Sequence, residues 1–405
     1  RSETAEIADL HLPLAPGSDI ALYNGLLHVL LSERRVDRDY IAAHTEDFSA
    51  LEQSVAAYPP DVVARLCALP EADIIRAARW FGGANAVLSL YCQGLNQSSH
   101  GTHNNAALIH LHLATGQIGR PGAGPFSLTG QPNAMGGREV GGLANLLSAH
   151  RELANPQHRA EVARLWGVPS VPERPGKTAI ELFAALKSGE IKAVWIACTN
   201  PAHSLPDQTQ VRAALAAAEF VVLQEAYGNT DTAAFADLLL PATTWGEKEG
   251  TVTNSERRIT HLTAAVAAPG EARHDWQIAV DFARRLGRQL SQPAETLFPY
   301  EHPEQIFNEH RETTRGRDLD ISGLSYALLD SLGPQQWPFP AGADRGRQRL
   351  YEDGVFPTAN GRARFVLVEH QPPAEVTTAQ HAISLISGRL RDQWHGMSRT
   401  GTVAR

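Results

Sequence analysis

A stretch rich in glycine and proline, Gln117 to Arg138, has the composition of an ordered loop that wraps a ligand. Glycine permits positive φ angles and close approach of the backbone to a bound molecule, whereas proline fixes the chain between such points. The apolar residues Ile118, Phe126 and Met135 would anchor this loop, whereas a mobile linker would consist mainly of Gly and Ser. The stretch is therefore predicted to be an ordered loop around a ligand.

Three polar side chains of this loop are candidates for contact with a ligand: Gln131, Asn133 and Arg138. An arginine fork suits a flat, delocalised oxyanion such as nitrate or a carboxylate. The alternative for Arg138 is a surface ion pair with Glu139 or another carboxylate. From the chemistry of the residues alone, both readings stay open.

A second segment, Ala236 to Arg258, joins an apolar strand to a polar run. The strand ends at Pro241, and hydroxyl, amide and charged residues follow. Such a run offers hydrogen-bond partners for a polar heterocycle or a phosphate. The alternative is a solvated surface loop, which would have no need of Trp245.

Histidines form a third group, with His100 and His103 three positions apart and His110 and His112 following. The spacing suggests zinc, but no cysteine or carboxylate nearby completes a tetrahedral set. His110 and His112 are predicted to pack within a helix, and no metal-ligating residue is predicted.

Several common function classes lack their sequence signals. There is no G-x-G-x-x-G between a strand and a helix, no Walker A motif and no G-x-S-x-G. A net charge of −8 disfavours a nucleic-acid binder, and no run approaches about 18 apolar residues, so no membrane span is predicted. The three cysteines form no C-x-x-C pair, which suits a reducing cytoplasm.

The elements that would position these segments alternate between helices and short apolar strands. Helices are predicted at Asp19 to Ser32, with one apolar face, and at Pro70 to Trp80. Four apolar runs read as strands buried on both faces, and each leads into a polar turn: 86–91, 193–197, 220–223 and 383–386. Ligands of open α/β sheets lie at the carboxyl ends of strands, so the four turns are candidate pieces of one site. Ordinary strand-to-helix loops are the alternative.

The domain organisation follows from length and composition. Single cores stop growing at roughly 250–300 residues, so the chain is expected to form more than one lobe. We predict α/β domains at 1–125 and 126–290, an irregular connection at 291–375 with a few strands near Phe365 to Val368, and a further domain beginning in 376–405. Both ends look abrupt, so a fragment of a longer protein is expected.

Seven motifs in order resemble those of the molybdopterin oxidoreductase family, and within it the large catalytic subunit of nitrate reductases of the bacterial assimilatory type. They are G-L-N-Q (94–97), T-G-Q-I-G-R-P-G (115–122), S-L-T-G-Q-P-N-A-M-G-G-R-E-V-G (127–141), C-T-N-P (198–201), A-D-L-L-L-P-A (236–242), E-K-E-G-T-V-T-N-S-E-R-R (247–258) and G-R-L-R-D-Q-W-H (388–395). The resemblance implies Rossmann-like parallel-sheet domains that bind dinucleotides, with a C-terminal β-barrel domain, also dinucleotide-binding, starting at 376–405.

The resemblance also implies a cofactor, molybdenum held by two molybdopterin guanine dinucleotides, and the residues around it. Carried over by motif, the residues facing the metal and the substrate are Arg138, Gln131 and Met135. The residues lining the dinucleotides are Gln93, Gly94, Asn96, Gln97, Thr199, Asn200, Pro201, Gln224, Glu225, Thr230, Glu249, Gly250, Thr251, Asn254, Arg257, Gly388, Arg389, Gln393, Trp394 and His395.

The implied reaction is the two-electron reduction of nitrate to nitrite by oxygen-atom transfer, in the cytoplasm, with electrons from a donor protein or reductase domain. Two family features are missing from this sequence: the four-cysteine motif for a 4Fe–4S cluster, expected in the parent, and the cysteine ligand to molybdenum. Activity of the chain alone is therefore in question. The alternatives are a formate dehydrogenase-like enzyme on the same scaffold and a metal-free scaffold subunit of a respiratory complex.

Overall fold

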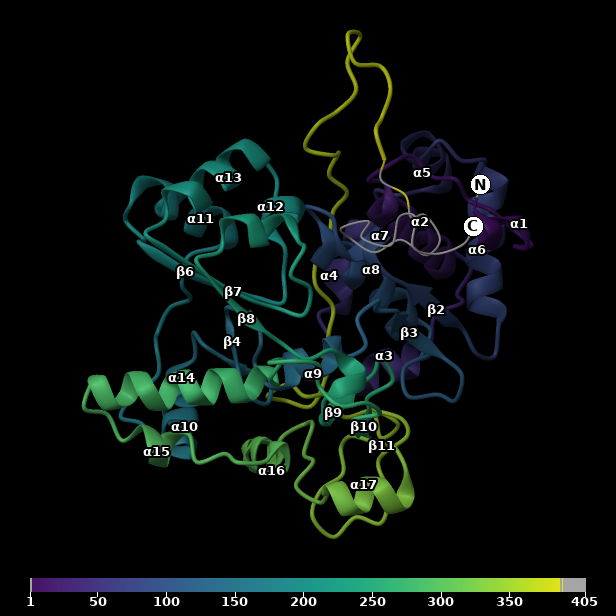
Figure 1. The fold of residues 1–405 in the computed structure, drawn as a ribbon. Helices are drawn as coiled ribbons and strands as arrows, with labels where there is room; N and C mark the ends of the chain where they lie inside the picture. Colours follow the sequence, from purple (N-terminus) through teal and green to yellow (C-terminus); the bar gives the residue numbers. More distant parts are fainter. Residues whose placement is uncertain (1, 387, 389–405) are drawn as a thin grey trace. The chain divides into compact units, whose positions relative to one another are not determined.

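A computed structural model describes residues 2–386 and 388 of the 405. The chain divides into two compact units, the first comprising Arg1–Gly130 and Arg347–Ser387 and the second comprising Gln131–Gly346 and Gly388–Arg405. These bounds differ from the predicted domains, because the second unit runs past 290 and the predicted connection at 291–375 contributes to both units. Figure 1 shows the elements of each unit.

The first unit is mainly helical. Its elements are α1 (Glu3–Glu6), α2 (Asp19–Ser32), α3 (Arg38–His44), β1 (Thr45–Glu46), α4 (Phe48–Val55), α5 (Pro60–Cys67), α6 (Glu71–Gly83), β2 (Leu88–Tyr91), α7 (Gln93–Asn96), α8 (Gly101–Ala114), β3 (Gly124–Ser127) and β12 (Ala363–Arg364). The predicted strand near Phe365 to Val368 is displaced, since the strand consists of Ala363–Arg364, which pairs in parallel with β1.

Helix α2 lies at the centre of this unit, against α4, α5, α6 and α8. Its bounds match the prediction, but its buried residues extend around the helix beyond the single face that was expected, as Ile20 and Val29 show. Gly25 permits the close packing of α5, because a Cβ atom there would lie 2.6 Å from a methyl carbon of Val63. Other helices pack against α2 on several sides, which explains why more than one of its faces is buried.

Strands β2 and β3 form a two-stranded parallel sheet, with Leu88 paired to Gly124 and Tyr91 to Ser127. The strand predicted at 86–91 is confirmed, but burial on both of its faces is wrong. Leu88 is 52% exposed and Leu90 58% exposed, because no element within the described part of the chain covers that face.

The second unit mixes helices and strands. Its elements are α9 (Ala134–Glu139), β4 (Leu146–Leu147), β5 (Arg151–Glu152), α10 (Pro156–Trp166), α11 (Ala179–Ser188), β6 (Ala193–Ala197), α12 (Pro201–Ser204), α13 (Gln208–Ala217), β7 (Phe220–Glu225), η1 (Asp231–Phe235), β8 (Leu238–Pro241), η2 (Trp245–Glu247), β9 (Gly250–Thr253), β10 (Arg258–Leu262), α14 (Asp275–Gln289), α15 (Ala294–Leu297), α16 (Pro303–Thr314), α17 (Tyr326–Leu332) and β11 (Gln335–Gln336).

A parallel sheet in the order β6-β7-β8 organises the candidate turns of this unit. Ile196 and Leu223 pack with Leu215 in a core between the sheet and the pair α11 and α13. Neighbouring residues of a strand point to opposite faces, so Trp195 lies on the other side, where it meets Phe282 of α14 edge to face. The strands predicted at 193–197 and 220–223 are confirmed, and all three carboxyl ends lie at one edge.

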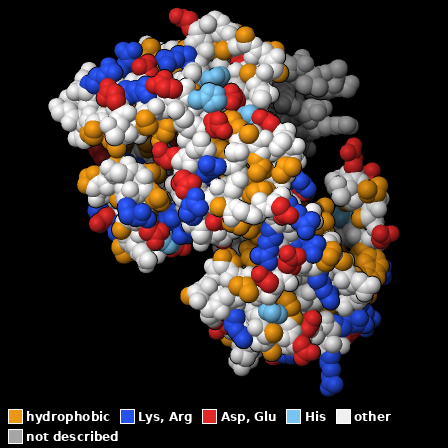
Figure 2. Space-filling model, turned by 90° about the horizontal axis from the view of Figure 1, so that it is seen from below, with side chains coloured by type: hydrophobic (Ala, Val, Ile, Leu, Met, Phe, Trp, Pro, Cys, Tyr) orange, Lys and Arg blue, Asp and Glu red, His pale blue; other side chains and the backbone are white. Residues whose placement is uncertain are grey.

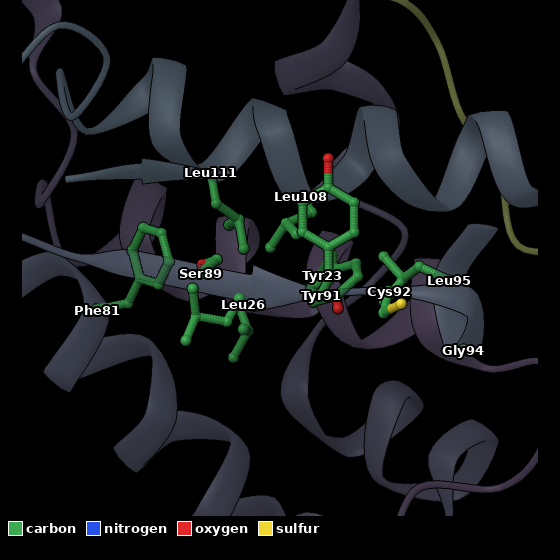
Figure 3. A pocket seen from close by; sticks show the side chains of 11 residues that line it. Tyr23, Leu26, Phe81, Ser89, Tyr91, Cys92, Gly94, Leu95, Leu108 and Leu111 are labelled. Carbon is green, nitrogen blue, oxygen red and sulfur yellow. The ribbon is translucent and has the colours of Figure 1, made fainter. Parts of the chain in front are cut away.

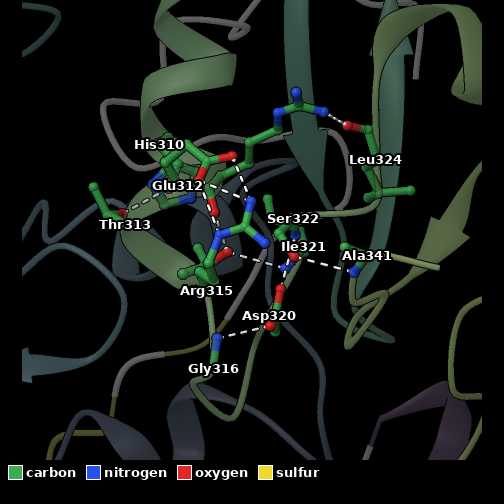
Figure 4. A network of polar contacts seen from close by, with 12 residues as sticks. His310, Glu312, Thr313, Arg315, Gly316, Asp320, Ile321, Ser322, Leu324 and Ala341 are labelled. Carbon is green, nitrogen blue, oxygen red and sulfur yellow. Dashed lines mark hydrogen bonds and ion pairs between the residues drawn. The ribbon is translucent and has the colours of Figure 1, made fainter. Parts of the chain in front are cut away.

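Residues 291–346, which were predicted to be irregular, contain three helices and a strand. Polar contacts join the segments between them, as Figure 4 shows. The carboxylate of Asp320 accepts the backbone N–H groups of Gly316 and Ser322 at 2.7 and 2.9 Å, and the Ser322 hydroxyl accepts from the N–H of Ala341. Side chain to backbone bonds of this kind order a segment that has little apolar periodicity, which explains why the pattern did not reveal it.

The fourth predicted strand, 383–386, is wrong. Ile383 and Leu385 are almost fully exposed and form no strand, since a strand needs a partner for its backbone groups and no described residue supplies one. Most of the domain predicted to begin in 376–405 lies outside the described residues.

Charged side chains are mixed over the surface. On the face drawn in Figure 2, Lys and Arg lie among Asp and Glu, without a continuous field of one sign. None of the helices that the structure describes is long and apolar enough to cross a membrane.

Candidate functional site

The turn after β6 is built around Asn200 and Thr232. Cys198 has a positive φ angle of 59°, and its N–H donates to the carbonyl oxygen of Gln224 at 3.0 Å, so the chain leaves the sheet directly beside β7. The Oδ1 atom of Asn200 accepts from the backbone N–H and the hydroxyl of Thr232, at 3.0 and 2.7 Å. Thr232 is fully buried, whereas Thr199 is exposed. Asn200 therefore ties the β6 turn to η1.

Asp275, the first residue of α14, gathers side chains from the ends of β6 and β7. Its Oδ1 atom accepts from Nε2 of Gln224 at 2.8 Å, and its Oδ2 atom lies 2.7 Å from Nζ of Lys248. The thiol of Cys198 lies 3.5 Å from Oδ1. Burial raises the pKa of Asp275, but hydrogen bonds from Lys248 and Gln224 outweigh it, so the pKa lies below its usual value.

The carboxylate of Asp275 also acts on the pKa of the neighbouring Cys198 thiol, after the larger effect of burial. Partial burial, followed by the negative charge of Asp275, raises the pKa of Cys198 to about 11. Sequence reasoning missed Asp275, because an aspartate in the first turn of a helix is common and does not by itself indicate a site. Its place in the fold, opposite two strand ends, is what makes it part of this cluster.

Glu225 is the last residue of strand β7, and Thr230 lies in the loop that follows it. The Oε1 atom of Glu225 accepts the N–H of Ala226 at 2.7 Å. The hydroxyl of Thr230 is buried and has no hydrogen-bond partner among the described residues. A buried hydroxyl without a partner is destabilising, so a ligand that supplied a partner would be favoured here.

Glu249 lies just before β9 and faces two histidines. Its Oε1 atom lies 3.5 Å from Nε2 of His261 and 3.6 Å from Nε2 of His302. The Nδ1 atom of His261 is 2.7 Å from the carboxylate of Asp330. The neighbouring predicted residues Gly250 and Thr251 form the first half of strand β9.

Asn254 and Arg257 form the turn between β9 and β10. The Oδ1 atom of Asn254 accepts the N–H groups of Glu256 and Arg258, both at 3.0 Å. Arg257 has a positive φ angle of 69°, and its guanidinium lies over the ring of Trp337 and donates to the carbonyl oxygen of that residue. Both residues therefore shape the hairpin, and the structure does not group them with the turns of the β6-β7-β8 sheet.

The loop predicted to face the metal becomes the short helix α9. Gln131 and Met135 are half-buried and Arg138 is exposed. Arg138 forms no hydrogen bond or ion pair with any residue that the structure describes. The alternative ion pair with Glu139 is excluded, because that carboxylate binds Thr253 and Trp337 instead.

In the first unit, the turn after β2 adjoins a cavity of about 320 Å³ (Figure 3). Cys92 and Gly94 line it together with apolar side chains and the rings of Tyr23 and Tyr91. The side chain of Asn96 is held by Nδ2 of Asn105 at 2.9 Å.

The remaining residues of this turn extend around α7. Gln93 accepts from the Cys92 thiol at 2.8 Å, and Gln97 is exposed. A Cβ atom on Gly101 would lie 2.2 Å from the carbonyl oxygen of Asn96, so glycine allows α7 to approach α8. The turn is thus placed by a tight contact between two helices.

His110 and His112 are packed within α8, as predicted. The Nε2 atom of His110 accepts the N–H of Val366 at 3.3 Å, and that of His112 lies 2.7 Å from the hydroxyl of Ser89. Burial lowers the pKa of each to about 4. Within the described part of the chain, no group of three His, Cys, Asp or Glu residues is arranged to hold a metal ion.

Of the candidate site residues near the C-terminus, only Gly388 lies within the described part of the chain. Gly388 is described, and no other described residue lies within 4 Å of where its Cβ atom would be. Arg389, Gln393, Trp394 and His395 lie outside the described residues.

The residues at the strand ends of the second unit fit a polar dinucleotide. They offer the unpartnered hydroxyl of Thr230, the exposed hydroxyl of Thr199 and the ammonium of Lys248, and two exposed aromatic side chains, Tyr227 and Trp245, lie in the same loops. Hydroxyl and ammonium groups suit phosphates, and aromatic faces suit a flat heterocycle. The donor set thus matches the chemistry of the cofactor that the motifs imply.

The chain is similar in sequence to known nitrate reductases. It is 44% identical to a nitrate reductase of Synechocystis sp. over 99% of this chain and 56% of that protein. It is 43% identical to a nitrate reductase of Klebsiella oxytoca over 100% of this chain and 46% of that protein. The chain therefore spans about half the length of these relatives.

A solved structure and a family model agree on the fold. Acetylene hydratase from Pelobacter acetylenicus is 19% identical and superimposes with a TM-score of 0.63, over 90% of this chain and 50% of that one, which supports the mixed helix and parallel-sheet architecture. The model of the molybdopterin oxidoreductase family matches residues 1–285. With that match and the ordered motifs, the chain belongs to the molybdopterin oxidoreductase family, an oxidoreductase family whose cofactor contains molybdenum and a pterin.

Proposed function

We propose that this chain forms the cofactor-binding core of a molybdenum nitrate reductase, with the metal held by two molybdopterin guanine dinucleotides. The observation that carries the proposal is the 44% and 43% identity to two nitrate reductases over essentially the whole chain. The exposed guanidinium of Arg138, which is free of partners among the described residues, supports it. Because the chain spans about half of those relatives, the activity of the whole protein is itself part of the proposal.

One set of residues would hold a dinucleotide at the strand ends of the second unit. These are Thr199, Asn200, Pro201, Gln224, Glu225 and Thr230. Asp275 joins this set, because it fixes the side chains of Gln224 and Lys248. Separately from this set, the residues Glu249, Gly250, Thr251, Asn254 and Arg257, on or beside the β9-β10 hairpin, are also proposed to contact a dinucleotide. Gln93, Gly94, Asn96 and Gln97 of the first unit, and Gly388, Arg389, Gln393, Trp394 and His395, complete the proposed contacts.

Arg138 would bind the substrate. Its planar guanidinium can donate two parallel hydrogen bonds to the oxygens of nitrate, and it remains charged at neutral pH. When bound, the cofactor supplies two-electron oxygen-atom transfer, which converts nitrate to nitrite. Gln131 and Met135, which precede Arg138 in the same segment, would face the metal and the substrate beside it.

Electrons must come from outside these residues. Reduction of nitrate to nitrite and water consumes two electrons and two protons, so we propose an electron-donor protein or a reductase domain as partner. The three cysteines of this sequence provide no four-cysteine set, so a 4Fe–4S cluster would take its ligands from elsewhere in the whole protein. A cytoplasmic location is proposed from the three free thiols.

The test is molybdenum and pterin content of the whole protein, followed by nitrite formation from nitrate with a reduced dye. About one molybdenum and two pterins per chain, with nitrite produced, is the expected result. Full cofactor with formate oxidation and no nitrite would favour the formate dehydrogenase alternative. Absence of both molybdenum and pterin would favour the scaffold alternative.

A further inference from the structure

Both ends of helix α9 bind one residue, Thr253, the last of strand β9. At the start of the helix, Oδ1 of Asn133 accepts the backbone N–H of Thr253 at 2.9 Å. At its end, Oε2 of Glu139 accepts the hydroxyl of Thr253 at 2.8 Å. Thr253 is 4% exposed and Glu139 is 3% exposed, so solvent competes little for these bonds. The helix is thus fastened to β9 at two points.

The second oxygen of Glu139 binds a different element. Its Oε1 atom accepts from Nε1 of Trp337 at 2.6 Å, and the backbone N–H of Trp337 donates to the carbonyl oxygen of Arg257 at 3.2 Å. One carboxylate therefore joins α9 to β9 and to the segment after β11. Hydrogen bonds to a charged acceptor are the stronger kind, and both here are buried.

Two glycines in α9 have a physical explanation in this arrangement. A Cβ atom on Gly136 would lie 2.1 Å from Oδ1 of Asn133, so a larger residue would push the carboxamide away from Thr253. At Gly137 a Cβ atom would meet no atom of the described residues within 4 Å. Only the first glycine is required by the contact, which offers a matched pair of substitutions.

We propose that Asn133 and Glu139 are positioning residues that fasten α9 to Thr253 and thereby fix the direction in which Arg138 is presented to the anion. This inference rests on the proposed function, in which Arg138 binds nitrate. Arg138 directly precedes Glu139, so any rotation of the helix end moves its guanidinium. Asn133 and Glu139 touch neither substrate nor cofactor in this scheme and act through Arg138.

Glu139 is buried, and both of its carboxylate oxygens accept hydrogen bonds. Burial raises its pKa, and the hydrogen bonds from Thr253 and Trp337 oppose that rise. His150, whose charge would also lower the pKa, and Asp318, whose charge raises it, are the titratable groups that act on it across space. A buried carboxylate that lost its two donors would be costly, so the arrangement is expected to be rigid.

The first arm of the test is hydrogen exchange followed by mass spectrometry on the whole protein, which needs no turnover. Glu139→Ala and Asn133→Ala are expected to speed exchange of the α9 amides at least about tenfold, because the helix loses an attachment. Val140→Ala, an exposed neighbour outside the contact, is the control, and Gly136→Ala against Gly137→Ala repeats the comparison. Unchanged exchange in all the variants would overturn the inference.

The second arm is kinetic. Glu139→Ala is expected to raise the nitrate KM about tenfold with kcat and molybdenum content nearly unchanged, and Glu139→Gln, which can still bond both partners, should restore the KM. A double variant with Arg138→Ala should have no higher KM than Arg138→Ala alone, because Glu139 acts through Arg138. Additive effects would overturn the positioning role.

The two proposals fail in different ways. If the unmodified protein carries full cofactor and does not reduce nitrate, the proposed function is wrong, and the exchange arm still decides whether the two residues hold α9. If nitrate is reduced and the KM of Glu139→Ala is unchanged, the positioning role alone is wrong. Should Glu139→Ala fail to fold, Asn133→Ala and Thr253→Val carry both arms.

Discussion

The turns of the β6-β7-β8 sheet and the helix α9 hold their candidate residues in opposite ways. In the turns, the side chain of Asn200 is bonded to Thr232 and that of Gln224 to Asp275. These side chains therefore stabilise the fold in addition to any contact with a ligand. On α9, Arg138 is exposed and engages no described residue, while its neighbours fasten the helix. Under the proposed function, the residues assigned to the cofactor also form structural bonds, whereas the residue assigned to the substrate is left free.

The largest effect on nitrate reduction is expected from the substitution of Arg138. Arg138→Ala should lower kcat/KM for nitrate about 100-fold, since hydrogen bonds to a charged group contribute roughly 1.5–3 kcal/mol. Molybdenum content and the free energy of unfolding should stay unchanged, because Arg138 supports nothing else. Steady-state kinetics and urea denaturation measure the two. A loss of stability in this variant would break the comparison.

Asn200→Ala tests a residue of the other kind, whose side chain forms structural hydrogen bonds. The change leaves the buried hydroxyl and N–H of Thr232 without their acceptor, which should cost about 2 kcal/mol of unfolding free energy. Bound pterin should also fall. Asn229→Ala, an exposed amide in the next turn, is the control for urea denaturation and pterin analysis. Normal stability with reduced pterin would mean that Asn200 contacts the cofactor alone.

Asp275→Asn should destabilise the protein by only about 1 kcal/mol, because its ion pair with Lys248 is a quarter to a third exposed. Its sharper consequence is chemical. The Asp275 charge helps raise the pKa of Cys198, so removing it should lower that pKa, increase the thiolate fraction at pH 8 and speed alkylation several-fold. Cys92 serves as the internal control in a mass-spectrometric rate measurement, and equal rates before and after the change would contradict this role.

The smallest effect concerns Thr230. Replacing it with Val removes a buried hydroxyl that has no described partner, so the cofactor-free protein should gain about 0.5 kcal/mol of stability. Cofactor retention should fall if that hydroxyl binds a dinucleotide. Thermal denaturation with and without cofactor shows whether the sign reverses, and the same sign in both states would remove Thr230 from the site.

Prediction from sequence succeeded where local pattern decides the outcome. The strands at 193–197 and 220–223 and the helix at Asp19–Ser32 were recognisable because apolar runs and helical spacing indicate the type of element. It failed at 383–386, where an apolar run has no described strand to pair with, and at 291–346, where side chain to backbone bonds order the chain without apolar periodicity. The face of β2 was also misjudged, because burial depends on what covers a strand.

The sequence by itself determined the family, the order of the candidate turns and the identity of the residues available to them. Motifs show which side chains are present and in what order along the chain, but not which of them are in contact. Only the tertiary structure decided that Asp275 lies opposite the ends of β6 and β7, that Glu139 binds Thr253 and Trp337 rather than Arg138, and that Asn254 and Arg257 shape a hairpin. These contacts join residues far apart in the chain, and no local pattern encodes a hydrogen bond between Glu139 and a tryptophan 198 positions away.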